Sequence, residues 1–410
     1  MNSAASQFDL TAARCHAIDQ MQRQSLDVLV IGGGIVGAAT AFFARRAGLR
    51  VVLLEKRPAL CTLTTPVSTG AFRLQFDNAD EIGLVREGIE LFDQFAEIAE
   101  LPGYDLRIRK QGYLFCARSE AGAQHQRHFV EALHGWGVDD LELLSGDEAR
   151  YRFAYLSPDI IQARFRAGDG WLDPKRLTLG YARASGASIC LDTPAIGFEL
   201  SGDRVIGVRT PRGSIACEHA VVATGPFAAP VAALAGCFLD LRPTIRHKLI
   251  IPELPSLPTD SPMTIDEETA AHWRPGLAGC YALWTEPGTP PGEPLDNVPT
   301  SVDFAFGLLD PRSPRSLARL SPVWESAWHD GSLYWVLQAG QYTYTADHRP
   351  LLGPSGVPGL VLNVGYSGHG IMASAGGSRL VVDAMLGRLA PETNPFRPQR
   401  TMLERPLDIL

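Results

Sequence analysis

The stretch VLVIGGGIVGAATAFFARRAGLRVVLLEKR, residues 28–57, constrains the fold of this chain more than any other segment. Leu26–Ile31 is a short apolar run rich in β-branched side chains, which is typical of a buried parallel strand. Glycines follow at once, and Ala38–Ala47 then has the composition of a helix with Gly48 as its C-cap. Val51–Leu54 is a second buried strand. The segment predicts a strand–helix–strand unit of a parallel sheet.

The three spaced glycines and the acid after the second strand point to a dinucleotide. Gly32 permits the tight turn, Gly34 lacks the Cβ that would block a pyrophosphate, and Gly37 lets the helix pack closely on the sheet. The helix N-terminus presents N–H groups and a partial positive charge. Glu55 is placed to accept hydrogen bonds from a ribose diol. The pattern predicts an ADP moiety, which NAD and FAD share. The alternative is a glycine-rich turn without a ligand.

A second glycine-rich turn, NVGYSGHGIMASAGG, lies at residues 363–377. Its glycines indicate a turn with no room for further bulky side chains, so its backbone is expected to come close to a flat or buried object. A helix that begins at Ile371 would point its N-terminus at that object, where it would stabilise the negative charge of a reduced flavin. The alternative is a helix cap with small residues for packing. Together with the ADP signature, the turn favours FAD.

Composition excludes several classes of function. The chain has 410 residues, 45% hydrophobic residues and a net charge of −8, without a long basic run, which argues against a nucleic-acid partner. The longest apolar stretch, residues 28–44, contains glycines and is followed by two arginines, so it does not predict a membrane span. Residues 1–24 lack the apolar core of a secretory signal and form an N-terminal extension.

The cysteines and histidines predict neither disulfides nor a metal site. The seven cysteines include no CxxC pair, and the histidines show no HExxH motif. Reduced thiols are typical of the cytoplasm, which is the predicted location.

Six stretches carry a resemblance to a known family. The chain resembles the D-amino-acid oxidase superfamily of FAD-dependent oxidoreductases, in particular its glycine oxidase, sarcosine oxidase and dimethylglycine dehydrogenase-like branch. The stretches are the GGGIVG turn with Glu55, STGAFRLQF (68–76), DGWLDPKRL (169–177), VVATGPFA (221–228), DHRPLLG (347–353) and GYSGHGIM (365–372).

The glycine turns at both ends and an antiparallel middle predict an α/β (α+β) fold. The resemblance likewise implies a discontinuous Rossmann-type FAD-binding domain with an inserted mixed or antiparallel β-sheet substrate domain. We expect residues 25–90, 150–238 and 332–400 in the first domain, and 91–149 and 239–331 in the second. The expected middle elements include helices at 80–100, 120–136 and 316–329, strands at 205–210, 213–217, 220–222 and 334–338, and an exposed Pro- and Gly-rich loop at 287–299.

The resemblance implies FAD, and the local sequence favours its non-covalent attachment. Some relatives join the flavin to a His or Cys, but residues 61–76 contain no His, and Cys61 falls too early for a known attachment point. The expected cofactor-binding residues are Gly32, Gly34, Ile35, Val36, Gly37, Glu55, Lys56, Ser68, Thr69, Gly70, Ala195, Ala223, Thr224, Gly225, Gly365, Ser367, Gly368, His369, Gly370 and Ile371.

The candidate substrate residues are Arg73, Gln75, Tyr281, Tyr342 and His369, of which Arg73, Tyr342 and His369 are the catalytic candidates. Arg73 suits a bidentate carboxylate contact, and its alternative is a structural ion pair. For His369 the alternatives are a hydrogen bond to substrate or flavin and a helix cap. For Tyr342 they are a cover over the substrate and a core aromatic residue. Residues 273–275, WRP, are a further candidate cavity lining.

The resemblance implies oxidation of the C–N bond of a small amino acid, imino acid or N-alkyl amino acid by hydride transfer to flavin N5. The alternatives are oxidation of a 2-hydroxy acid and a flavoprotein subunit of an electron-transfer complex. Sarcosine oxidase-like members place a Lys over the flavin from a strand similar to residues 280–287, which contain none here. A dehydrogenase is therefore favoured over an oxidase, with the acceptor, oxygen or a protein or quinone, left open. Lys248 and Arg246 alternate on another strand and face either inward or outward.

Overall fold

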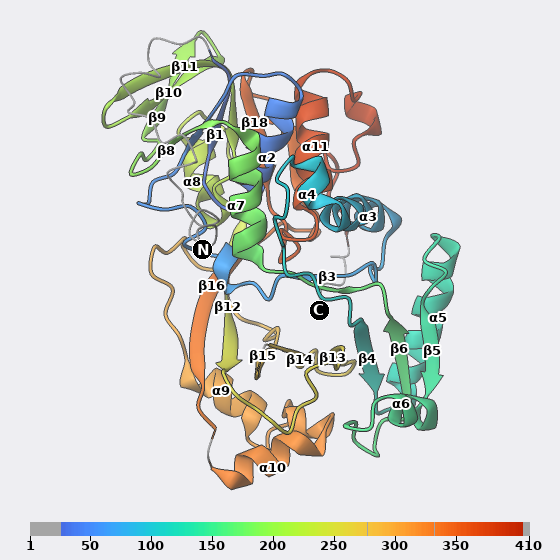
Figure 1. The fold of residues 1–410 in the computed structure, drawn as a ribbon. Helices are drawn as coiled ribbons and strands as arrows, with labels where there is room; N and C mark the ends of the chain where they lie inside the picture. The colour runs from blue at the N-terminus through green and yellow to red at the C-terminus, as the bar shows by residue number, and fades with distance from the viewer. Residues whose placement is uncertain (1–25, 277, 332, 405–410) are drawn as a thin grey trace.

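The computed structural model describes residues 26–276, 278–331 and 333–404 and has a mixed α/β fold (Figure 1). In the described ranges, two eight-stranded sheets and one two-stranded sheet form. The helices are α2 (Ile35–Arg46), α3 (Ala79–Asp93), α4 (Phe95–Ile98), α5 (Glu120–Gly135), α6 (Gly146–Arg152), α7 (Pro174–Ser185), α8 (Ala228–Ala233), α9 (Val302–Leu309), α10 (Pro322–Asp330) and α11 (Ser374–Met385), with short 3-10 turns η3 (Thr65–Val67), η4 (Gly225–Phe227), η5 (Leu317–Arg319) and η6 (Pro391–Thr393).

The strands follow the same chain order. They are β1 (Leu26–Ile31), β2 (Val51–Leu54), β3 (Ala71–Phe72), β4 (Tyr113–Ala117), β5 (Glu142–Ser145), β6 (Gln162–Arg166), β7 (Gly170–Trp171), β8 (Ser188–Cys190), β9 (Gly197–Ser201), β10 (Arg204–Thr210), β11 (Gly213–Val222), β12 (Arg242–Ile251), β13 (Met263–Asp266), β14 (His272–Pro275), β15 (Cys280–Leu283), β16 (Val336–Tyr344), β17 (Leu351–Pro354) and β18 (Leu360–Val364).

The first sheet has the strand order β17-β18-β11-β1-β2-β8, and β1 pairs in parallel with β2 and β11. The strand–helix–strand prediction is confirmed, with the bounds of both strands as expected. Both faces of the sheet are covered: α2, α7 and α11 pack on one face, and α8 with β9 and β10 covers part of the other (Figure 1). Continuous apolar strands are buried because of this double cover.

One strand differs from its prediction. Residues 213–217 and 220–222 were expected as two members of an antiparallel set, but they form the single strand β11. Its first part pairs antiparallel with β10, and its last residues pair in parallel with β1 and β18. Burial alternates along the first part and is complete from Ala220 to Val222. That change marks the point where the strand enters the doubly covered sheet.

Several helix ends also shift. Helix α2 begins at Ile35, three residues before its prediction, because Gly34 in extended conformation serves as the N-cap. Helix α11 begins at Ser374 rather than Ile371, because residues 371–373 form a turn in which the Ser374 amide donates to the Ile371 carbonyl. The expected helix at 80–100 is divided into α3 and α4, and the one at 316–329 into η5 and α10.

The second sheet has the order β16-β12-β15-β14-β13-β4-β6-β5 and is antiparallel except for the β4–β13 pair. Helices α9 and α10 cover its far face, where Trp273 and Trp324 pack edge to face (Figure 1). The opposite face is turned toward the first sheet, and β12 and β16 form the long ribbon that reaches it. The inserted mixed sheet that was predicted from the sequence is therefore present.

Two strands lie outside the domain division expected from the sequence. Strands β6 and β16 belong to the second sheet by their hydrogen bonding, whereas the expected ranges 150–238 and 332–400 assigned them to the cofactor domain. We propose the same two-domain division with these strands moved to the substrate domain. The expected extension at 1–24 lies outside the described residues.

The described residues include no helix that is long and apolar enough to cross a membrane. Six cysteines in this part of the chain are buried, and Cys61, Cys116, Cys217, Cys237 and Cys280 among them are free thiols. Within the same ranges, no group of three or more His, Cys, Asp or Glu side chains is arranged to hold a metal ion.

Candidate cofactor and substrate site

The turn between β1 and α2 depends on two of its glycines for its shape. Gly32 has a φ of +114°, a conformation that L side chains rarely adopt. A Cβ at Gly37 would lie 1.8 Å from the Gly32 carbonyl oxygen, so no larger residue fits there. The helix therefore packs directly on the turn, as the spacing of the glycines predicts.

Glu55 is held by backbone amides at the end of β2. Its Oε2 accepts from the Gly33 amide at 2.7 Å, and its Oε1 accepts from the Arg57 amide at 2.8 Å. These bonds fix the carboxylate beside the glycine turn, where each oxygen keeps a lone pair for another donor.

The N-terminus of α2 is open to an anion. Its N-cap, Gly34, has no side chain, and the first turn contains no acidic residue. The nearest contact of a Cβ at Gly34 would be Thr65 Oγ1, 3.3 Å away, so the space above the turn belongs to a cavity rather than to protein. Thr65 Oγ1 accepts from the Ile35 amide at 3.2 Å. Apart from this bond the helix start is uncapped, which makes it suited to a pyrophosphate.

The second glycine turn is tied to the first by a buried polar network. Asn363 Nδ2, at the end of β18, donates to Thr40 Oγ1 on α2 at 2.9 Å and to Ser378 Oγ on α11 at 3.1 Å. The Tyr366 hydroxyl donates to Asn363 Oδ1. A Cβ at Gly377 would lie 2.1 Å from that hydroxyl oxygen. These contacts fix the relative position of two turns that are far apart in sequence.

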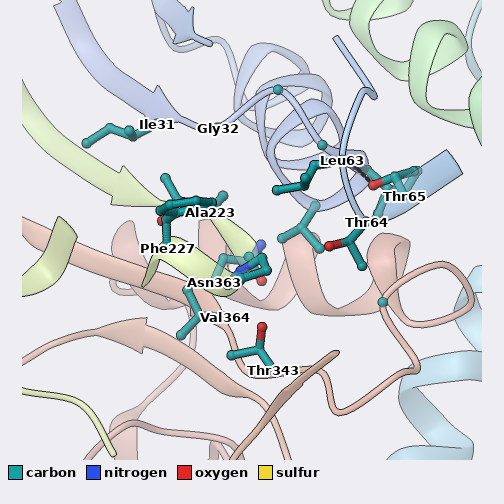
Figure 2. A pocket seen from close by; sticks show the side chains of 18 of the residues that line it. Ile31, Gly32, Leu63, Thr64, Thr65, Ala223, Phe227, Thr343, Asn363 and Val364 are labelled. Atoms are coloured by element: carbon teal, nitrogen blue, oxygen red, sulfur yellow. Dashed lines mark hydrogen bonds between the residues drawn. The ribbon is translucent and has the colours of Figure 1, made fainter. Parts of the chain in front are cut away.

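A cavity of about 330 Å³ lies between the two turns. Figure 2 shows Leu63, Thr64 and Thr65 on one side of it and Ala223 and Phe227 on the other. Of the expected cofactor-binding residues, those that line it are Gly32, Gly34, Ile35, Val36, Glu55, Lys56, Ser68, Ala195, Ala223, Thr224, Gly225, Gly365, Ser367, Gly368, Gly370 and Ile371. Gly37 and Gly70 lie behind the lining, whereas Thr69 and His369 line a neighbouring cavity.

The residues that line the large cavity fit FAD. Its lining includes Thr224, whose Oγ1 is buried and makes no hydrogen bond to the part of the chain that the structure describes. A buried hydroxyl of this kind requires a partner. The uncapped α2 N-terminus would hold the pyrophosphate and the fixed Glu55 carboxylate the ribose.

The Pro- and Gly-rich stretch 287–299 lies beside this cavity. It forms no helix or strand and is mostly exposed, as expected. It is nevertheless held by the buried side-chain amide of Gln341. The Gln341 Oε1 accepts from the Leu295 amide and its Nε2 donates to the Glu293 carbonyl, each at 2.8 Å. Asp296 also pairs with Lys56 at 2.5 Å. Gln341 and Lys56 both line the cavity, so these contacts fasten residues 287–299 beside it. We call residues 287–299 the strap.

A second cavity, of about 80 Å³, adjoins the first. Both are lined by Ser68, Tyr342, Ser367, Gly368 and Ile371. The small cavity lies against the near face of the second sheet, where β13, β14 and β15 contribute Met263, His272 and Leu283. The two cavities thus have a common wall.

Three of the substrate candidates line the small cavity, namely Arg73, Tyr342 and His369. Arg73 is buried, and its guanidinium carbon lies 4.5 Å from the centre of the Phe76 ring and 5.9 Å from that of Phe115. The Tyr342 ring lies against Gly368, where a Cβ would be 2.8 Å from a ring carbon. Burial raises the pKa of Tyr342 to about 12, so it stays a neutral hydroxyl.

His369 is buried and pairs with an acid. Its Nδ1 lies 3.2 Å from Glu81 Oε1 on α3, and the edge of its ring packs against Phe76 with the ring centres 4.8 Å apart. Burial lowers the pKa of His369, and the Glu81 hydrogen bond partly offsets that effect.

The remaining substrate candidates do not line either cavity. The Gln75 amide is buried and bonded on both sides, donating to Asp169 Oδ2 at 2.9 Å and accepting from Arg164 at 2.9 Å. The ring of Tyr281 lies between two cations, 5.0 Å from Lys248 Nζ and 4.4 Å from the guanidinium carbon of Arg274. Trp273 belongs to the core on the far face of the sheet.

Sequence reasoning left the direction of Arg246 and Lys248 open, and the structure places both on the near face of β12. Arg246 lines the small cavity and donates to the Tyr344 hydroxyl at 3.2 Å. In the described ranges, no carboxylate lies within ion-pair distance of Arg246. Lys248 instead donates to the carbonyl oxygens of Pro66 and Ser68.

Other residues of the small cavity had no signal of their own in the sequence. Tyr113, His272 and Trp284 are examples, each from a different segment of the second sheet. The period-2 pattern of a strand tells which residues share a face but not which face meets a cofactor.

Comparisons with known proteins agree with this geometry. A family model described as FAD dependent oxidoreductase matches residues 27–384. The Xenopus laevis protein named FAD-dependent oxidoreductase domain-containing protein 1 is 26% identical over 92% of this chain and 84% of its own. The mitochondrial dimethylglycine dehydrogenase of Rattus norvegicus is 24% identical over 88% of this chain and 43% of its own. The solved structure of glycine oxidase from Bacillus cereus superposes with a TM-score of 0.77 at 22% identity, covering 92% of this chain and all of that one.

Proposed function

The chain belongs to the DAO family of FAD-dependent oxidoreductases, and from this we propose that it oxidises the C–N bond of a small amino acid, imino acid or N-alkyl amino acid. The family acts on amino acid-like substrates, and two similar proteins are named as a dimethylglycine dehydrogenase and a glycine oxidase. The substrate class of this chain is our proposal.

The observation that carries the proposal is the small cavity with two guanidinium groups at the wall of the large one. Arg73 and Arg246 both line it. Arginine binds a carboxylate through paired hydrogen bonds, and a desolvated site strengthens them. A volume of about 80 Å³ favours a substrate with a short side chain.

When bound, FAD supplies the redox chemistry by accepting a hydride at N5 from the carbon next to nitrogen. The protein residues position the substrate for it. Arg73 and Arg246 would fix the carboxylate, and Tyr342, which lines both cavities, would cover the substrate at their common wall.

We propose that the FAD is bound non-covalently. Cys61 lines the large cavity, but burial raises the pKa of its thiol to about 11, so the nucleophilic thiolate is scarce at neutral pH. Acid precipitation of the yellow protein should leave FAD in the supernatant. Colour that stays with the pellet would contradict non-covalent binding.

The test of the function is anaerobic bleaching of the purified yellow protein. We expect an amino acid or N-methyl amino acid to bleach the flavin under nitrogen. A panel of small amino acids, their N-methyl forms and the matching 2-hydroxy acids identifies the class. A protein that none of these bleaches, but that a reduced partner protein does, would instead be an electron-transfer subunit.

Oxidation of a 2-hydroxy acid is the second candidate, because the His369–Glu81 pair would also supply the base that this reaction needs. An alcohol keeps its proton at neutral pH and needs a base, for which a buried imidazole beside a carboxylate is suited. Bleaching by the 2-hydroxy acids alone would support this candidate.

We further propose that this protein is a dehydrogenase and that it acts in the cytoplasm. No lysine occurs in residues 280–287, and Lys248 is engaged with backbone carbonyls. After anaerobic reduction by substrate, we expect slow reoxidation in air-saturated buffer and fast reoxidation by an artificial acceptor. Reoxidation by oxygen at the rate of turnover would make the protein an oxidase. Five buried free thiols support a reducing compartment, which cell fractionation tests.

A further inference from the structure

Glu81 is a buried acid that was not among the candidate site residues expected from the sequence. It lies in the first turn of α3 with 2% of its surface exposed. Its amide is capped by Asn78 Oδ1 at 2.7 Å, and its Oε1 meets His369 Nδ1. Its Oε2 is buried and makes no hydrogen bond to any described residue. The helix N-terminus favours the negative charge at this position.

The contact with Glu81 selects one form of the His369 ring. A carboxylate accepts, so the neutral imidazole must carry its proton on Nδ1. The lone pair is then on Nε2, the other ring nitrogen of a side chain that lines the small cavity. A proton acceptor is thus available on a side chain that lines the same cavity as Arg73 and Tyr342.

The other charged groups around His369 oppose its protonation. Burial lowers the pKa of His369 most, the hydrogen bond and charge of Glu81 raise it, and electrostatic interactions with Arg73 and His348 lower it further. Tyr342 is neutral at ordinary pH. Further groups that line the cavity are Tyr113, Arg246, His247, His272 and Tyr344, and burial lowers the pKa values of both other histidines. The ring is thus unprotonated at neutral pH and able to accept a proton.

We propose that Glu81 is a positioning residue that holds His369 as the base which deprotonates the substrate ammonium before oxidation. This inference rests on the proposed function, since an amine must lose a proton before its nitrogen lone pair can assist hydride loss. In the step, one N–H bond of the substrate breaks and an Nε2–H bond forms. The step transfers a proton and no electrons. The imidazolium is stabilised by Glu81 and returns its proton to solvent when the product leaves.

The kinetic test is the Glu81→Gln variant, which keeps the size of the side chain and removes its charge. We expect kcat/KM to fall about 10- to 100-fold at neutral pH, within the range of general-base effects. The loss should shrink to less than about 3-fold as pH rises toward 10, where the substrate amine has itself lost the proton. A merely structural role would lower kcat/KM equally at every pH, and that result would overturn the proposal.

The matched control is Glu87→Gln on the same helix. Glu87 pairs with Arg379 at the surface and lies outside both cavities. We expect its pH profile to follow the unchanged protein. The flavin absorbance of each variant reports whether FAD and fold are retained. A similar pH-dependent loss in Glu87→Gln would mean that the effect comes from the helix, not from the His369 contact.

A second measurement needs no activity. In protein labelled with ¹⁵N-histidine, the His369 signals are identified by their absence from His369→Gln. We expect the Nδ1–H form in the unchanged protein, and a lower His369 pKa in Glu81→Gln. An Nε2–H form would overturn the proposal. If no substrate of the panel bleaches the flavin, the proposed function fails, while this spectrum still decides the His369–Glu81 arrangement.

Discussion

Lys248 Nζ donates a hydrogen bond to the carbonyl oxygen of Pro66 at 3.1 Å and joins the second sheet to the segment that lines the cofactor cavity. A longer bond of 3.4 Å reaches the Ser68 carbonyl. Burial lowers the pKa of Lys248 to about 8, and the positive charges of Arg274 and Lys175 act in the same direction. Arg274, nearby, donates to the Thr69 carbonyl at 2.9 Å. Two buried cations thus hold the chain at residues 66–69.

The lowered pKa of Lys248 predicts a pH-dependent stability. Between pH 8 and the ordinary pKa of 10.5, the unfolded chain binds the proton that the folded protein has lost, so stability from this residue rises with pH. A Lys248→Met variant lacks this gain. We expect the unfolding free energy of the original protein to increase relative to that of the variant from pH 8 to pH 10.5. Urea unfolding across that range measures it, and a constant difference would contradict the lowered pKa.

Substitution of Arg246 by Met should weaken the binding of carboxylate substrates. Loss of a bidentate contact in a desolvated site costs about 2–4 kcal/mol, or roughly 30- to 1,000-fold in kcat/KM. Arg73→Leu should behave alike if both arginines hold the carboxylate. The control is Arg242→Met, an exposed arginine on the same strand that pairs with Asp240. A decarboxylated amine substrate should lose little in either cavity variant. An equal loss with the amine would assign that arginine to structure or cofactor.

Two glycine substitutions should separate cofactor binding from folding. Gly34 has a φ of −78°, and a Cβ there meets only Thr65 Oγ1, so Gly34→Val should fold but lose FAD. Gly37→Ala places its Cβ against the Gly32 carbonyl and should lower the melting temperature or prevent folding. Circular dichroism and flavin absorbance measure both. Yellow Gly34→Val protein would mean that the pyrophosphate does not lie over this turn.

Gln341→Ala should release the strap. The side chain makes two hydrogen bonds to residues 293 and 295, and its loss leaves both backbone groups without that partner. We expect faster FAD dissociation and faster proteolytic cleavage within residues 287–299. Gln338→Ala, an exposed position on the same strand, is the control. Unchanged cleavage in Gln341→Ala would show that the strap is held by other contacts, such as Asp296 with Lys56.

Local patterns predicted the elements on which the cofactor cavity is built, because their signals are short-range. Strands β1 and β2 are continuous apolar runs between glycines and have the predicted bounds. The substrate side was harder, because its residues come from strands whose inward face depends on partners distant in sequence. Gln75 shares a strand-like alternation with Arg73, yet the buried Asp169 and Arg164 hold it away from the cavity.

Helical periodicity could have identified Glu81 as a buried residue from the sequence. It lies three, four and seven residues before Leu84, Val85 and Gly88, all of them buried on the same side of α3. An acid in an apolar stripe at a helix start needs a partner, since burial of a lone charge is costly. The sequence does not identify His369 as that partner, because 288 positions separate them.

The network of Asn363, Thr40 and Ser378 determines when, during translation, this part of the cofactor cavity can form. Thr40 leaves the ribosome 323 residues before Asn363 and 338 residues before Ser378, its partners in this network. Strand β18 and helix α11, which complete the wall around the glycine turn of β1, arrive with them. The unit of β1, α2 and β2 must therefore keep apolar surface uncovered until β18 and α11 have emerged. A nascent chain arrested before residue 360 would lack this part of the cofactor cavity and should depend on chaperones to stay unaggregated.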